Sequence, residues 1–118
     1  MQTNEAIMAF SQSEKIKAGI IWIAQTIEIL GAIPEGERKG CDRIVHALLN
    51  MVGHEISLAK ALVKHEIWQE VDSHLNKAEV MITSGVGQEA TIHLSRALSK
   101  VTTIGQESMT LLKETKLL

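Results

Sequence analysis

The chain has 118 residues, enough for one domain, residues 1–118, that buries about two thirds of the surface its unfolded form exposes. Its 12 basic and 14 acidic residues give a net charge of -2, and aromatic residues make up 3%, so neither a positive field nor a set of stacking surfaces favours nucleic acid. A single cysteine, Cys41, and a start without a basic, apolar leader predict a reducing, cytoplasmic setting. We expect no membrane contact, because the most apolar run, residues 18–24, is far shorter than the ~20 residues of a membrane span.

The first predicted helix covers residues 4–31. Its apolar side chains recur at alternating spacings of four and three, which places them on one side of a helix: Ile16, Ile20, Ile23, Ile27 and Leu30. Trp22 and Ile29 widen this stripe on one flank and Ile21 widens it on the other, so we expect the helix to contact more than one neighbour. Gly31 ends the helix, and Pro34 marks the loop that follows.

The second predicted helix covers residues 37–64 and carries two adjacent apolar stripes. The first stripe consists of Val45, Leu49, Val52, Ile56, Ala59 and Val63. The second consists of Ile44, Leu48, Met51, Leu58 and Leu62, with Glu55 as an interruption. A helix with two such stripes is expected to lie between two partners.

The third predicted helix, residues 67–84, follows a tight turn near His65 and Glu66. The apolar spacing slips there, and a helix running through both segments would be ~70 Å long, too long for so small a domain. The expected core positions of the third helix are Ile67, Val71, His74, Ala78 and Met81. Gly85 and Gly87 then separate it from a fourth predicted helix, residues 88–116, whose apolar side consists of Ala90, Leu94, Ala97, Leu98, Val101, Ile104, Ser108, Leu111 and Leu112.

Four helices joined by short loops predict an all-α fold, an antiparallel up-down-up-down four-helix bundle. The third helix is the shortest, so the fourth should extend about three turns beyond the other end of the bundle. That extension, and the ends of the first two helices, would expose apolar residues, which predicts a homo-oligomer, a twofold dimer, with an interface formed by Ile27, Leu30, Ile33, Ile44, Met109, Leu111 and Leu112. The alternative is that residues 1–10 fold over the extension.

Histidines are the main candidates for chemistry. With the bundle as predicted, His54, His74 and His93 lie on three helices at heights within about 5 Å of one another. Such a layer could bind zinc or another divalent metal, with Glu70 or Glu89 as an oxygen ligand or as a partner of the ligands. The alternative is a core His74 with two surface histidines. The zinc-protease spacing is absent, because its second histidine would fall on Leu58.

The string "HALLNMVG", residues 46–53, resembles the helix of histidine phosphotransfer domains, which are themselves four-helix bundles. The resemblance implies His46 as a phosphoryl acceptor. It covers one helix, and the family's lysine and glycine, three and four residues after the histidine, are replaced here by Leu49 and Asn50.

The most economical interpretation is a small cytosolic bundle that acts through protein–protein association, as an adaptor, a chaperone-like protein or a structural subunit. The sequence predicts no catalytic residue and no cofactor. The alternatives are a metal- or ligand-binding bundle that uses the histidine layer and a phosphotransfer-like domain that uses His46.

Overall fold

The computed structural model describes residues 1–118 and contains four α-helices, one short 3-10 helix and no strand. The helices are α1 (Thr3–Gly31), η1 (Glu35–Glu37), α2 (Lys39–Leu62), α3 (Ile67–Thr83) and α4 (Gly87–Glu114). The prediction of an all-helical fold with four helices is confirmed. The main difference lies before α2, where Glu37, expected to begin the second helix, belongs to the separate turn η1, and α2 begins at Lys39.

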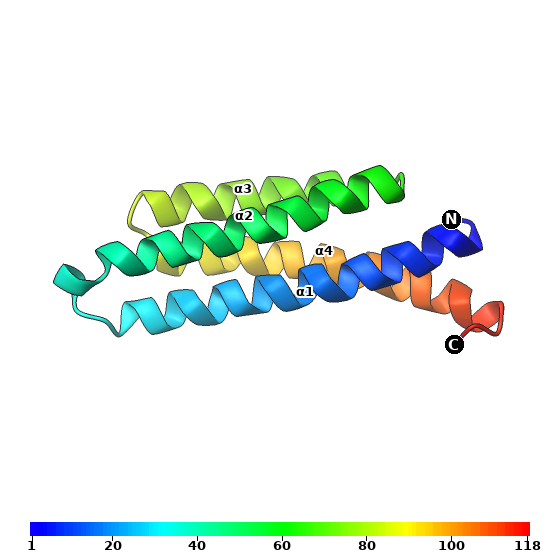
Figure 1. Ribbon diagram of the computed structural model, residues 1–118, viewed down its shortest axis with the longest axis horizontal. Coiled ribbons are helices and arrows are strands. Elements are labelled where there is room, and N and C mark those ends of the chain that lie inside the picture. The colour runs from blue at the N-terminus through cyan, green and yellow to red at the C-terminus, as the bar shows by residue number, and fades with distance from the viewer.

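The four helices pack into an elongated bundle of 54 × 21 × 20 Å. Each helix contacts the next one along the chain, α1 also contacts α4, and the diagonal pairs do not meet. In Figure 1 the α1–α2 and α3–α4 connections lie toward one end of the bundle, and the α2–α3 turn and both termini lie toward the other. None of the helices combines the length and the apolar character that crossing a membrane requires.

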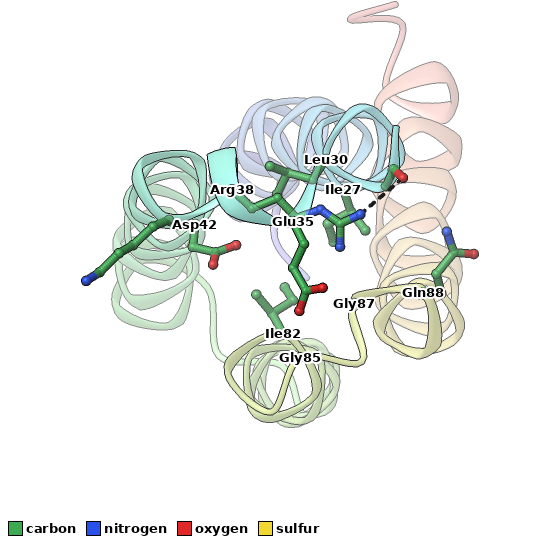
Figure 2. A pocket seen from close by; sticks show the side chains of 11 residues that line it. Ile27, Leu30, Glu35, Arg38, Asp42, Ile82, Gly85, Gly87 and Gln88 are labelled. Atoms are coloured by element: carbon green, nitrogen blue, oxygen red, sulfur yellow. Dashed lines mark hydrogen bonds between the residues drawn. The ribbon is translucent and has the colours of Figure 1, made fainter. Parts of the chain in front are cut away.

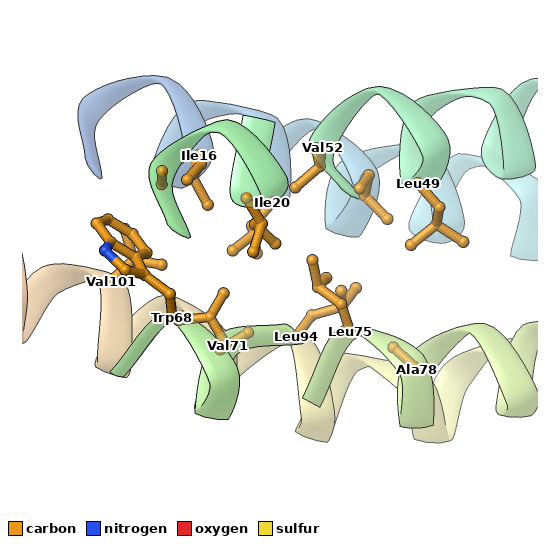
Figure 3. Packing of buried hydrophobic residues seen from close by; sticks show 14 of the residues in the cluster. Ile16, Ile20, Leu49, Val52, Trp68, Val71, Leu75, Ala78, Leu94 and Val101 are labelled. Carbon is orange, nitrogen blue, oxygen red and sulfur yellow. The ribbon is translucent and has the colours of Figure 1, made fainter. Parts of the chain in front are cut away.

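The core follows the expected stripes of α1, α2 and α4, and Figure 3 shows side chains from all four helices interlocking along the bundle. The fully buried members include Ile16, Ile20, Ile23, Val45, Trp68, Val71, Val101 and Ile104. In α3 the expected register is partly wrong. Leu75 is 4% exposed and occupies the position expected for His74, which is half-buried. The reason is Trp68, whose large side chain joins the core and sets a face of residues 68, 71, 75 and 78.

The α2–α3 turn is confirmed, although no glycine, proline, asparagine or serine marks it. The backbone N–H of Ile67 donates a hydrogen bond to Nδ1 of His65, 3.1 Å away, which satisfies one of the free donors at the start of α3. Because Nδ1 accepts, the ring proton lies on Nε2, which is 3.2 Å from Oε2 of Glu107 on α4. His65 therefore closes the turn and ties it to α4.

The residues predicted to form an oligomer interface lie at the two ends of the bundle. Near one of these ends α1 packs against α4, and Ala6 and Ala9 are fully buried. The helices approach closely at Gly105, where an added Cβ would lie 3.0 Å from Oγ of Ser13. The first turns of α1 therefore cover part of the extension, as the alternative expects, while Leu117 and Leu118 stay exposed. Of the seven predicted interface residues, Ile27 and Leu112 are buried within the chain, Leu30, Ile33, Met109 and Leu111 are half-buried, and only Ile44 is widely exposed.

Candidate functional site

A broad apolar surface lies across α1 and α2. We call it the α1/α2 face and define it as Trp22, Ile29, Ile44, Leu48, Met51, Leu58 and Leu62. Trp22 is 60% exposed and Met51 is 62% exposed, although both are among the largest apolar side chains of the protein. Ile44, Met51 and Leu58 repeat every seven residues, as do Trp22 and Ile29, so on each helix these side chains lie on one side. The second stripe expected on α2 is thus present and largely exposed, apart from Leu48, which is half-buried against the core.

A groove runs between the two helices at the middle of this face. Its volume is about 480 Å³, and it is lined by Trp22, Leu48 and Met51 beside small residues, Ala18 and Gly19. The groove is narrow at Gly19, where an added Cβ would lie 2.6 Å from Cγ2 of Val52. Because the two helices approach closely there, the larger side chains of Trp22 and Met51 form the sides of the groove.

The charged residues at this groove lie toward one end of it. Glu14 accepts a hydrogen bond from Lys17 at 2.8 Å, and Oε2 of Glu55 accepts one from Nε2 of Gln12 at 2.9 Å. Lys15 lines the same groove and forms no ion pair within the chain. The groove therefore has one carboxylate in an ion pair, Glu14, and two opposite charges without one, Lys15 and Glu55, with no strong excess of either sign.

The structure brings together two of the three histidines of the predicted layer. The rings of His74 and His93 stack between α3 and α4 with centroids 6.5 Å apart and planes 22° apart. Nδ1 of each ring is buried without a hydrogen-bond partner. Burial lowers the pKa of His74 below 6.5, and the positive charges of Lys77, Arg96, His93 and Lys100 lower it further. Burial and the neighbouring positive charges thus favour the neutral form of the His74 ring.

The other predicted ligands do not join this pair. His54 is exposed on α2, Glu70 is 3.7 Å from Lys100 in an ion pair, and Glu89 is exposed in the first turn of α4. No group of three or more histidine, cysteine, aspartate or glutamate side chains is placed to hold a metal. The three-histidine layer is therefore not formed, because His54 lies on the outer side of α2 and points away from the stripe that packs inward.

His46 is half-buried on α2 and makes no side-chain hydrogen bond or ion pair. The residue three positions later, Leu49, is 4% exposed and belongs to the core. The position that the phosphotransfer resemblance expects to carry a lysine therefore faces the interior of the bundle.

A second cavity, of about 360 Å³, opens at the end of the bundle where α1, α2, α3 and α4 surround it. Figure 2 shows Glu35, Arg38 and Asp42 around this opening, together with the apolar side chains of Ile27, Leu30 and Ile82. Arg38 donates from Nε to the carbonyl of Ile33 at 2.7 Å and from Nη2 to that of Gly31 at 3.4 Å. These carbonyls lie beyond the helical ladder of α1, so the guanidinium satisfies them and opposes the negative end of the helix dipole. Arg38 thus has a structural role in ending α1.

Comparisons of the chain with protein families, with curated proteins and with solved structures find no match. The interpretation of its function therefore depends on the geometry described above.

Proposed function

We propose that this protein is a cytosolic antiparallel up-down-up-down bundle that acts by protein–protein association, as an adaptor, a chaperone-like protein or a structural subunit, and that the α1/α2 face is its contact surface. What supports the topology is that sequential helices pack side by side through short connections at alternating ends (Figure 1). What supports a cytosolic setting is the single Cys41, which forms no disulfide.

The observation that carries the association is the exposure of Trp22 and Met51 on the two sides of one groove. Large apolar side chains scattered singly over a surface are ordinary, but a contiguous set on two adjacent helices marks a contact surface. Tryptophan and methionine are also enriched at interfaces relative to the rest of a protein surface.

Site-specific photo-cross-linking tests this function. The photoreactive residue p-benzoylphenylalanine, placed at Met51, should give cross-linked protein species in the cells that express the chain. The matched control is the same residue at Val80, which is 61% exposed on α3 and lies outside the face. Cross-links of equal yield at both positions, or none at Met51, would contradict the proposal.

A further inference from the structure

The α1/α2 face is about as large as one side of a standard protein interface. Its six widely exposed residues have exposed fractions between 37% and 62%. With roughly 200 Å² for a fully exposed side chain of aromatic size, the fractions of the six residues sum to at most about 650 Å² of apolar surface left uncovered. The largest apolar patch on a typical monomer is about 300–600 Å², and a standard interface buries about 800 Å² per partner. The half-buried Leu48 and the small residues of the groove add to this area and bring it close to the roughly 800 Å² that a standard interface buries on each partner.

The charges and the shape of the face suit a second copy of the same surface. A strongly acidic or basic partner would need an opposite excess of charge on the face. The face has none, because Glu14 pairs with Lys17, and Lys15 and Glu55 carry opposite charges without an ion pair in the chain. The shape of the face also suits contact with a second copy of itself. Trp22 and Met51 project beside a groove whose floor is formed by small residues, Ala18 and Gly19, so the projecting side chains of one copy can enter the groove of the other.

The relative heights of the residues on α1 and α2 determine which residues of two copies a given twofold axis brings into contact. The contact between Gly19 and Val52 places these two residues at the same height. Positions along the helix axes can be counted from this contact, because each residue advances about 1.5 Å. Trp22 then lies at a height between those of Ile44 and Met51. Lys15 lies level with Glu55, within about one residue. A twofold axis along the helices preserves these heights and places α1 of one copy over α2 of the other.

We propose that a second copy of this chain covers the α1/α2 face, with the twofold axis parallel to the helices, so that Trp22 of each copy packs beside Met51 of the other. This inference rests on the function proposed above and names the partner. Lys15 of each copy then meets Glu55 of its partner at the edge of the contact. An axis across the helices would instead place Lys15 over the apolar pair Ile29 and Ile44 and leave its charge unpaired.

Sedimentation equilibrium from low to high micromolar concentration tests the association. The wild-type protein should reach twice the chain mass of 13.0 kDa. Trp22 fluorescence should shift to shorter wavelength over the same range, whereas Trp68, fully buried, should contribute a constant signal. Met51→Glu should raise the dissociation constant of the dimer at least about 100-fold, because it places an unpaired charge in the contact. Val80→Glu, with a helical circular dichroism spectrum like that of Met51→Glu, should leave the constant unchanged.

Disulfide cross-linking tests the arrangement in a Cys41→Ser background. A chain with Ile29→Cys mixed with a chain with Ile44→Cys should form a mixed disulfide dimer, because these positions lie at nearly the same height on α1 and α2. A chain with Met51→Cys should not link to itself. Self-linking of Met51→Cys without the mixed disulfide would overturn the proposed axis.

The two proposals fail in different ways. A monomer at all concentrations, together with photo-cross-links from Met51 only to proteins of other mass, would overturn the second-copy inference and leave the association function standing. A monomer without cross-links at Met51 would overturn both.

Discussion

The α3/α4 side and the α1/α2 side of the bundle differ in the side-chain contacts that the chain makes on them. On the α3/α4 side, His74 stacks on His93, Lys100 pairs with Glu70, and His65 reaches Glu107. On the α1/α2 side, Gln12 and Glu55 make the only side-chain hydrogen bonds between the two helices, and large apolar side chains such as Trp22 lie exposed. The α3/α4 side also exposes Val80 and Ile92, but its polar contacts join separate elements of the chain. On the α1/α2 side the exposed Trp22 and Met51 line one groove, and a partner would remove that apolar surface from water.

The two tryptophans give the strongest test of this difference. Trp68→Ala should lower the free energy of unfolding by about 3–5 kcal/mol, because Trp68 is fully buried and its loss leaves a cavity. Trp22→Ala should change the stability of the dilute monomer by less than about 0.5 kcal/mol, because its side chain is mostly in water. Urea unfolding followed by circular dichroism measures both. Equal losses would show that Trp22 is packed within the chain.

Two glycines of the α1/α2 pair should respond with opposite signs. Gly19→Ala should destabilise the protein by about 1–3 kcal/mol, since the new methyl group meets the branched side chain of Val52, which has little freedom to move. Gly53→Ala should stabilise it by about 0.5–1 kcal/mol, because an added Cβ there meets nothing within 4 Å and alanine favours the helix. Urea midpoints compared at equal slope measure the pair. A stabilising Gly19→Ala would show that α1 and α2 are not so closely packed.

The α2–α3 turn, which His65 joins to α4, should be sensitive to substitution although no glycine, proline, asparagine or serine marks it. His65→Ala should cost about 1 kcal/mol, because it removes the hydrogen bond to the N–H of Ile67 and the contact with Glu107. Lys64→Ala, next to it and exposed, serves as the control and should cost less than about 0.5 kcal/mol. Hydrogen exchange at the first amides of α3 should rise only in the His65 variant. Equal exchange in both variants would exclude the capping role.

The histidine stack should give the α3/α4 side a small dependence on pH. The pKa of His74 is lowered in the folded protein, so the unfolded chain takes up the proton first as the pH falls. Its contribution to stability is therefore complete above about pH 6.5 and is lost as the pH falls through the folded-state pKa. Between pH 7.5 and pH 5, His74→Gln should lose less stability than the wild type, and His54→Gln, at an exposed position, should behave like the wild type. Identical slopes in all three proteins would exclude this role for His74.

Much of this fold follows from the spacing of apolar residues. The isoleucines of α1 and the first stripe of α2 are the core positions that the sequence predicts, because a helix places residues three and four apart on one side. The sequence also predicts a second apolar stripe on α2, where Ile44 and Met51 are seven residues apart, and a widening of the α1 stripe by Trp22 and Ile29.

The remaining features depend on contacts between residues far apart in the chain. Periodicity alone could not choose between His74 and Leu75, because the choice depends on how Trp68 fits the core. It could not show that the first turns of α1 cover the end of α4, because that depends on the length of α1 and on its close approach at Gly105. Nor could it show that the second stripe of α2 and the residues that widen the α1 stripe share one exposed face. The sequence by itself determined which residues avoid water, since that property belongs to each side chain and its place on a helix. Only the tertiary structure decided which of them the chain covers itself, since coverage depends on which helices are neighbours.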